Sequence, residues 1–240
     1  MTDAGSEVVF ADLHCHSDAS FDSLSRPADL VRVAIERGLT HLAITDHGSL
    51  RGAFTARELA PDCLTVIVGE EVRSLDGDVI GLYLERSVPA GLSAVETIAE
   101  IHEQGGLAGL PHPFDRFRAS GLARLSAESL VEVAAQVDYL EAWNARVPRM
   151  AVNERARTFA LEHGVPGVAV SDAHSTLEVG VAYTQLSGPI RDAAELLAAL
   201  PTATLVPGRA SFFVRAVTPW AKLVQRRRGH DRADAEAHRR

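Results

Sequence analysis

The sequence has few cysteines and no long apolar run, and both absences narrow the class of protein. Only two cysteines occur among 240 residues, Cys15 and Cys63. We therefore expect no disulfide framework, and we expect a reducing, cytoplasmic location. No apolar run approaches the roughly 18 residues of a membrane span, and residues 1–7 are polar and acidic, unlike a signal peptide. We therefore expect neither a membrane-spanning segment nor a membrane partner.

Signatures of other enzyme classes are missing as well. The sequence contains no P-loop, no Gly-x-Gly-x-x-Gly fingerprint and no Gly-x-Ser-x-Gly elbow. Nucleotide-dependent motors and serine hydrolases are therefore poor matches.

Acidic residues outnumber basic ones over residues 1–225 but not at the C-terminal end. Residues 226–240 contain six arginines against three acids, so the net charge of −8 leaves −11 on residues 1–225. An acidic body is a poor general binder of nucleic acid, although carboxylates that hold cations would neutralise part of this charge. Because residues 225–240 lack apolar side chains other than alanine, we expect one domain over 1–225 and a basic tail over 226–240, frayed or disordered.

Short apolar runs rich in β-branched residues alternate with amphipathic segments along the chain. The runs predict strands at 8–13, 42–45, 65–69, 79–84, 107–110, 137–143 and 165–170. The amphipathic segments predict helices at 27–37, 94–104, 126–136, 149–163 and 192–200. This alternation is typical of a parallel, barrel-like α/β sheet. Asp76-Gly77, in a connection too short for a crossover, indicates that strands three and four are antiparallel, so we expect an irregular seven-stranded (β/α) barrel.

Histidines and carboxylates gather where these strands are expected to end. Five of the ten histidines, with several acids, fall in the segments Asp12-Leu-His-Cys-His16, Thr45-Asp-His47, Gly69-Glu-Glu71, Leu110-Pro-His-Pro113 and Ser171-Asp-Ala-His174. Such nitrogen and oxygen donors suit divalent metals of hard to borderline character. The C-terminal mouth of a barrel is also where active sites lie. The joint placement predicts a metal-dependent hydrolase.

The spacing within single segments is informative but leaves alternatives open. His14 and His16 are two apart on an expected strand end, with Asp12 on the same face, and two such imidazoles can grip one cation. Asp172 and His174 repeat that spacing. A polar strand end facing water is the ordinary alternative for each pair.

The remaining candidates are weaker when each is taken alone. Glu71 and its neighbour Glu70 are alternative candidates for a metal ligand, because successive residues of a strand point to opposite faces of the sheet. Asp22 is either a ligand or a cap for the following helix, and His112 is either a ligand or part of a rigid turn between two prolines. His47 is a ligand candidate that ends its strand. Its neighbour Asp46 is expected to orient an imidazole.

Together, these motifs resemble the four-motif signature of the polymerase and histidinol phosphatase (PHP) superfamily. The resemblance rests on Asp-Leu-His-Cys-His-Ser, Leu-Ala-Ile-Thr-Asp-His, Gly-Glu-Glu, Leu-Pro-His-Pro and Ser-Asp-Ala-His, and it covers nearly all of residues 8–185. It implies an irregular seven-stranded barrel that binds two or three divalent ions, usually manganese, zinc or iron. The implied ligands are His14, His16, Asp22, His47, Glu71, His112, Asp172 and His174. Many members also carry a histidine at the start of the fourth strand, where this chain has Asp78.

The resemblance and the residues lead to one expected function with two alternatives. We expect a stand-alone phosphoesterase that cleaves nucleotides, short oligonucleotides or small phosphorylated metabolites, with no obligate protein partner. Asp46, His112, Arg116 and Arg146 are the candidates for catalytic roles, the arginines as a clamp on phosphate. The alternatives are a histidinol-phosphate phosphatase and a metal-binding module without turnover.

Overall fold

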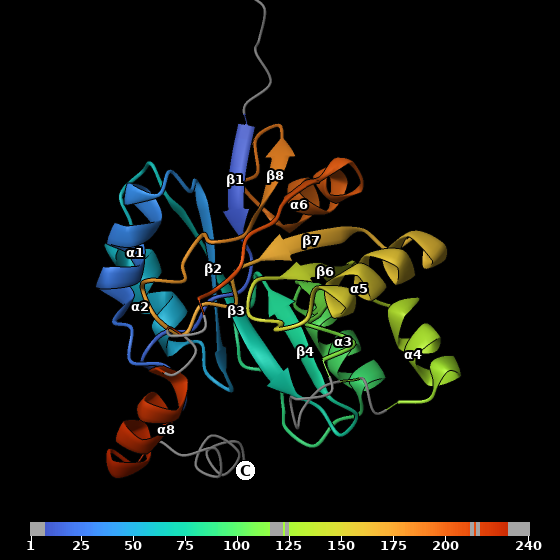
Figure 1. Ribbon diagram of the computed structural model, residues 1–240, viewed down its shortest axis with the longest axis horizontal. Helices are drawn as coiled ribbons and strands as arrows, with labels where there is room; N and C mark the ends of the chain where they lie inside the picture. The colour runs from blue at the N-terminus through green and yellow to red at the C-terminus, as the bar shows by residue number, and fades with distance from the viewer. Residues whose placement is uncertain (1–7, 116–121, 123–124, 212–213, 215–216, 230–240) are drawn as a thin grey trace, which may run out of the picture.

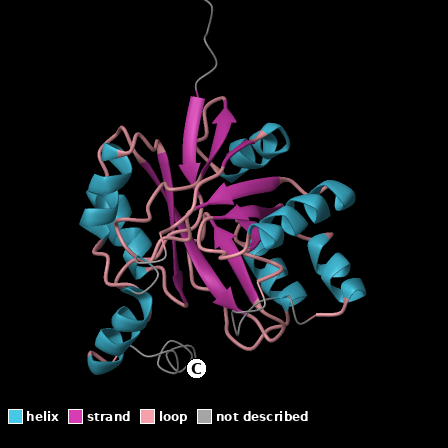
Figure 2. Cartoon of the chain, viewed as in Figure 1, coloured by secondary structure: helices cyan, strands magenta, loops and turns pink. Residues whose placement is uncertain are grey.

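The strands occupy the centre of the molecule and the helices surround them (Figure 2). The computed structural model describes residues 8–115, 122, 125–211, 214 and 217–229. The strands are β1 (Val8–Asp12), β2 (His41–His47), β3 (Thr65–Arg73), β4 (Asp78–Leu82), β5 (Leu107–Leu110), β6 (Tyr139–Asn144), β7 (Gly167–Val170), β8 (Tyr183–Ser187) and β9 (Thr204–Val206). The helices are α1 (Pro27–Glu36), α2 (Arg51–Leu59), α3 (Ala94–Glu103), α4 (Ala127–Ala134), α5 (Met150–His163), α6 (Ala193–Ala199), the 3₁₀ turn η2 (Leu200–Thr202) and α8 (Val217–Arg227).

All nine described strands form one mixed sheet, in the order β7-β6-β5-β4-β3-β2-β1-β8-β9. The predicted barrel-like α/β fold is confirmed, and so is the antiparallel pairing of β3 with β4. Two expectations need correction. The sheet has nine strands where seven were predicted, and β4–β5, β1–β8 and β8–β9 are also antiparallel. The reason is that β4 runs against both of its neighbours, while β8 and β9 return along the edge of β1.

The two ends of the sheet approach each other, so the barrel is nearly closed. The hydroxyl of Thr184 in β8 donates to the carbonyl of Ala169 in β7 and accepts from its N–H, both at 2.9 Å. Beyond the ends of β1 and β7, Cys15 and Ala173 form an isolated parallel bridge. Closure brings the segments that follow β1 and β7 side by side, which matters for the polar residues they carry.

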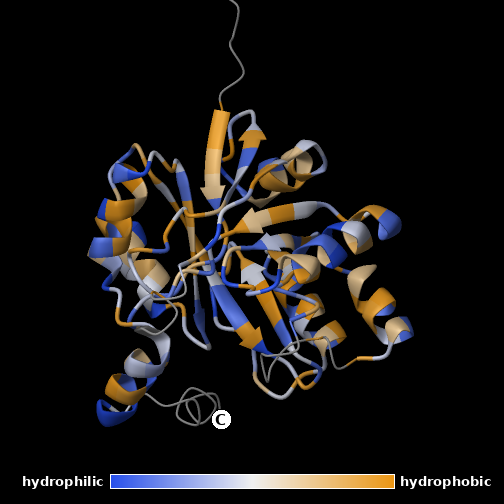
Figure 3. Cartoon of the chain, viewed as in Figure 1, coloured by the Kyte–Doolittle hydropathy of each residue, from blue (hydrophilic) through white to orange (hydrophobic). Residues whose placement is uncertain are grey.

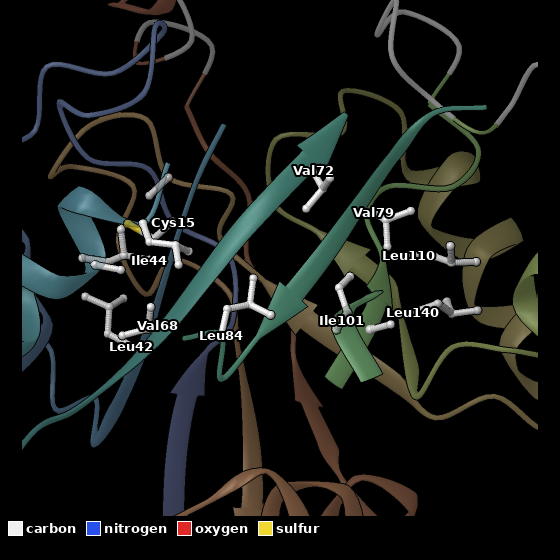
Figure 4. Packing of buried hydrophobic residues seen from close by; sticks show 14 of the residues in the cluster. Cys15, Leu42, Ile44, Val68, Val72, Val79, Leu84, Ile101, Leu110 and Leu140 are labelled. Atoms are coloured by element: carbon white, nitrogen blue, oxygen red, sulfur yellow. The ribbon is translucent and has the colours of Figure 1, made fainter. Parts of the chain in front are cut away.

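The apolar residues of the strands divide between the two faces of the sheet. One cluster, which includes Leu42, Ile44 and Val68, packs between the sheet and the helices, and Figure 4 shows these three side chains grouped beside the antiparallel pair β3–β4. A second cluster uses alternate positions of the same strands, such as Ala43 and Ile67, and fills the barrel interior. Strands β1 and β7 are largely hydrophobic in Figure 3, as expected for strands buried on both faces of a sheet.

Several helix ends follow from local sequence signals. The side chain of Ser93 accepts from Glu96 N–H and Glu96 accepts from Ser93, which is a capping box at the start of α3. Gly164 takes a left-handed conformation with φ of 66° directly after α5. By contrast, α2 begins after Leu50 without a side-chain cap, and it was not predicted. No helix in the described part of the chain is long and apolar enough to traverse a lipid bilayer.

The C-terminal helix α8 was also not predicted. It lies apart from the helices around the barrel, below α1 and α2 in Figure 1. It continues to Arg227, two residues past the domain boundary suggested by composition, and residues 230–240 of the expected tail lie outside the described residues.

Candidate metal centre

The register of neighbouring strands places the predicted site residues on the inner face of the barrel. His47 of β2 is paired with Glu71 of β3, and Asp46 with Glu70, so the two pairs point to opposite faces. Because β3 continues to Arg73, Glu71 lies within the strand and not at its end. The register therefore places Glu71, and not Glu70, on the same face of the sheet as His47.

The carboxylate of Glu71 lies at the centre of four imidazoles from three different segments of the chain. Its Oε2 atom is 3.2 Å from Nε2 of His14, 3.3 Å from Nε2 of His16 and 3.5 Å from Nε2 of His47. Its Oε1 atom is 3.4 Å from Nε2 of His112. His47 is slightly exposed and the other side chains are buried.

Two further carboxylates complete the cluster. Oδ1 of Asp172 is 3.7 Å from Nε2 of His14 and 3.6 Å from Nε2 of His16. Oδ2 of Asp22 is 3.1 Å from Nε2 of His174 and 3.5 Å from Nε2 of His47. All eight residues predicted as ligands are thus brought together.

The donor atoms fall into two groups that share one histidine. The first group, called the Asp172 group below, is His14, His16 and Asp172. The second, called the Asp22 group, is His16, Asp22, His47 and His174. Within each group the candidate ligand atoms lie within 4.8 Å of one another, so each group could hold one ion. Glu71 lies against members of both.

Two residues of the cluster have an unusual backbone conformation. The φ angles are 30° for His112 and 53° for Asp172, in the left-handed region that non-glycine residues rarely occupy. The surrounding structure must hold such conformations in place, and they are typical of functional sites.

Glu141 and Asn144 of β6 form hydrogen bonds to residues of the cluster. Oε1 of Glu141 is 2.5 Å from Nδ1 of His14, and its Oε2 accepts the backbone N–H of His112 at 2.7 Å. The Asn144 amide donates to Oε2 of Glu141 at 2.8 Å and to Oδ2 of Asp172 at 3.0 Å. The sequence reasoning missed both residues. Glu141 and Asn144 are three positions apart, so strict alternation would place them on opposite faces. The strand has a register shift between Glu141 and Trp143.

The chemistry of the donor set fits divalent cations. Nδ1 of His14 is hydrogen-bonded to Oε1 of Glu141, which directs Nε2 of the same ring into the cluster. Nδ1 of His174 likewise faces the carbonyl of Asp172 at 2.9 Å, leaving Nε2 to face Asp22. Histidines that ligate metals are usually held in this way.

The pKa values of three histidines in the cluster are shifted by burial and by the neighbouring carboxylates. Burial lowers the pKa of His14, but Glu141, Asp172 and Glu71 outweigh it and hold the pKa well above its usual value. Burial also lowers the pKa of His16, yet hydrogen bonds to Asp172 and Glu71 raise it to about 9. In His174 burial dominates and lowers the pKa to about 3, so this imidazole is neutral. Metal ions and protons would compete for the first two imidazoles.

Two other predicted residues, Asp12 and Asp78, have partners outside this cluster. Asp12 accepts backbone N–H groups of Ser171 at 3.0 Å and Gly180 at 2.8 Å, because β1 ends there and the alternation with His14 is broken. This corrects the expectation that Asp12 shares a face with the histidines. Asp78 belongs to neither metal group, and its Oδ1 atom is 3.2 Å from Nη1 of Arg73.

Asp46 and the two arginines complete the comparison with the predicted site. Asp46 accepts from the N–H of Ser17 at 2.6 Å and from its hydroxyl at 2.5 Å, so its hydrogen bonds tie β2 to the segment after β1. Arg146 donates to Glu178 and to Thr218, each at 2.7 Å. Arg116 lies outside the described residues. The catalytic roles of these residues stay predictions.

Gly52 in α2 provides a test of the Asp46 contact. A Cβ atom at this position would meet Ser17 Oγ and Asp46 Oδ2. In an open helical position, alanine is about 1 kcal/mol more favourable than glycine. Here we expect Gly52→Ala to destabilise the fold by about 1–3 kcal/mol, because the clash outweighs that gain.

Urea unfolding would measure this effect, with Thr55→Ala on the exposed face of α2 as the matched control. Equal or greater stability of Gly52→Ala would show that Asp46 and Ser17 are not packed against α2.

Comparisons with known proteins agree with this geometry. The family model described as PHP domain matches residues 12–137, and a second one, described as PHP-associated, matches residues 151–204. An uncharacterized protein of Methanocaldococcus jannaschii is 35% identical over 176 residues, which are 73% of this chain and 70% of that protein. A 5'-3' exoribonuclease of Haemophilus influenzae is 28% identical over 121 residues, 45% of this chain and 44% of that enzyme.

A solved structure has the same fold. It is a two-domain protein from Bacteroides vulgatus that contains a predicted PHP-like metal-dependent phosphoesterase, with a TM-score of 0.71 and 19% identity, and the match covers 85% of this chain and 66% of that one. The first family model, described as PHP domain, matches more than half of the chain and includes six of the eight clustered residues, among them His14, His47 and Glu71. The chain therefore belongs to the PHP domain family.

Proposed function

We propose that this protein is a metal-dependent phosphoesterase. The observation that carries the proposal is the position of Glu71, whose two oxygens lie 3.2–3.5 Å from four imidazole nitrogens. A carboxylate so placed can be shared by two cations, and sites with paired cations catalyse phosphoryl transfer. The family membership and the phosphoesterase in the Bacteroides neighbour support the same reaction class.

The reaction would be hydrolysis of a phosphate ester. The oxygen of water forms a bond to phosphorus while the ester P–O bond breaks, giving a phosphate and an alcohol. The residues proposed to hold two or three ions of manganese, zinc or iron are His14, His16, Asp22, His47, Glu71, His112, Asp172 and His174. When bound, these ions supply Lewis acidity toward phosphoryl oxygens and lower the pKa of water.

The other residues of the site would position these ligands. Glu141 fixes the ring of His14 and the backbone of His112, and Asn144 fixes Asp172. Both terminal nitrogens of Arg146 already donate to Glu178 and Thr218, so we propose that it acts on the His174 turn through Glu178. A direct contact of Arg116 or Arg146 with phosphate stays a prediction from the sequence.

Several phosphate esters fit the proposal, and a small phosphorylated substrate fits it best. The acidic body disfavours long nucleic acid, whereas a relative named as an exoribonuclease supports short oligonucleotides and nucleotides. We propose these as the first substrates to test, followed by sugar phosphates.

The test is a phosphate-release screen of manganese-loaded protein against mononucleotides, 5'-phosphorylated oligonucleotides, sugar phosphates and histidinol phosphate. We expect turnover that disappears after chelation and returns with Mn²⁺. His14→Ala and Asp172→Ala should abolish it, because each removes a candidate ligand from a different strand end.

His102→Ala is the matched control, since His102 lies on α3 away from the cluster, with its Nε2 atom 2.9 Å from Oδ2 of Asp138. Equal turnover in all three variants would place the site elsewhere. Turnover of histidinol phosphate alone would favour the histidinol-phosphate phosphatase, and metal binding without turnover of any ester would favour the non-catalytic module.

A further inference from the structure

One side chain of α8 is buried in the turn that follows β1. Gln225 is 1% exposed, and its Nε2 atom lies 2.8, 3.0 and 2.8 Å from the carbonyl oxygens of Asp18, Ser20 and Ser23. The amide nitrogen of glutamine carries two hydrogens, so the three carbonyl oxygens share two hydrogen-bond donors. A residue about 200 positions away in sequence therefore holds this turn in shape.

The turn held by Gln225 contains Asp22, a member of the Asp22 group. Inside it, the hydroxyl of Ser20 donates to Oδ1 of Asp22 at 2.7 Å. The hydroxyl of Ser23 contacts the carbonyls of His16 at 3.0 Å and of His174 at 3.1 Å. The carbonyls that Gln225 binds thus belong to the two serines that flank Asp22 in the turn and to Asp18.

The N-terminal part of α8 reaches the same group by a second route. The hydroxyl of Thr218 accepts from Nη2 of Arg146, and Nη1 of Arg146 donates to Glu178. Glu178 in turn accepts the backbone N–H of His174 at 3.1 Å. Nε2 of His174 is 3.1 Å from Oδ2 of Asp22. The contacts of Gln225 and of Thr218 therefore both lead to this one pair of residues.

The Asp172 group is supported differently. Its residues His14 and Asp172 are held by Glu141 and Asn144, which belong to β6 inside the barrel. The hydrogen bonds described for α8 go to the Asp18–Ser23 turn and to Arg146, and not to these two supports.

We propose that α8 is a C-terminal latch that assembles the Asp22 group, with Gln225 as its positioning residue. The latch acts less on the Asp172 group, which meets the same turn through the backbone carbonyl of the shared His16. The inference rests on the metal centre of the proposed function and adds to it a dependence of one ion on the C-terminal helix. Releasing α8 would then remove one ion and keep the other.

Gln225→Met tests the latch, because methionine keeps the length of the side chain and removes its hydrogen-bond donors. Calorimetric titration of the metal-free full chain with Mn²⁺ should show one ion bound about 10–100-fold more weakly and the other changed less, the range typical for losing an outer-shell partner. Visible absorption of the Co²⁺-loaded protein should lose the bands of one site. In the Gln225→Met background, Asp172→Ala should then abolish the remaining ion.

Leu223→Ala, at an exposed position of the same helix, is the control and should bind both ions like the wild type. If Gln225→Met does not fold, Thr218→Val removes the other anchor and should weaken the same ion. Unchanged binding of both ions in a folded Gln225→Met protein, or equal weakening of both, would overturn the latch. Wild-type protein that takes up no ion would overturn the metal centre and the latch with it.

Discussion

Replacing Glu71 by glutamine is expected to empty both metal groups and to abolish phosphate release. The substitution keeps the size of the side chain but removes the negative charge that four imidazoles face at 3.2–3.5 Å. It also places an amide group, which donates hydrogen bonds, where cations would bind. We expect the affinity for Mn²⁺ to fall by more than about 100-fold, beyond the range for losing an outer-shell partner. Turnover should fall by at least about 10²–10³-fold, the cost of one electrostatic group in other active sites.

Glu70→Gln is the matched control for this prediction. Glu70 is the neighbouring buried carboxylate on the opposite face of β3, and its Oε2 atom accepts the N–H of Val88 at 3.1 Å. Glutamine can keep that hydrogen bond, so metal uptake and turnover should stay close to those of the wild type. Metal content by elemental analysis and phosphate release would be measured on both variants. A Glu71→Gln protein that binds as many ions as Glu70→Gln would show that Glu71 is not a ligand.

The contrast between Glu70 and Glu71 also shows what the sequence can predict. Parity alone states that the two residues face opposite sides, but only the pairing with His47 across β2 and β3 shows which side is the barrel interior. The eight candidate ligands could be named because their side chains are donors that metals prefer and because the motifs resemble the PHP signature. The residues alone left Asp22, Glu71 and His112 open. Asp12 was misplaced because the alternation of a strand stops where the strand ends, and that end depends on the neighbouring strands.

The residues that support the cluster could not be found in this way. Glu141 lies 127 residues from His14 in sequence, and nothing in Glu-Ala-Trp-Asn separates it from an ordinary strand end. Gln225 was overlooked because an anchor was sought among apolar side chains, whereas α8 is fixed to the turn by hydrogen bonds. Strands β8 and β9 are short, and their formation depends on pairing, of β8 with β1 and of β9 with β8, more than on propensity.

Arg146→Met is expected to destabilise the fold by about 3–5 kcal/mol, the cost of breaking a buried ion pair by removing one partner. The side chains of Arg146 and Glu178 are 9% and 1% exposed, and their closest atoms are 2.7 Å apart. Without the guanidinium, the carboxylate of Glu178 would stay buried with only the N–H of His174 and the hydroxyl of Ser175 as donors. Urea unfolding of the metal-free protein would measure the loss, and a change below about 1 kcal/mol would show that the pair behaves like an exposed one.

The double variant Arg146→Met/Glu178→Gln separates a positioning role from a phosphate clamp. Glutamine removes the unpaired charge and keeps an oxygen for the N–H of His174, so the double variant should be more stable than Arg146→Met alone. If Arg146 acts by holding the His174 turn, turnover should recover together with stability, and this is the result we expect. If Arg146 contacts phosphate directly, stability would recover while turnover stayed low, because no cation would replace the guanidinium. Recovery of stability without recovery of turnover would therefore support the prediction from the sequence that Arg146 binds the phosphate of the substrate.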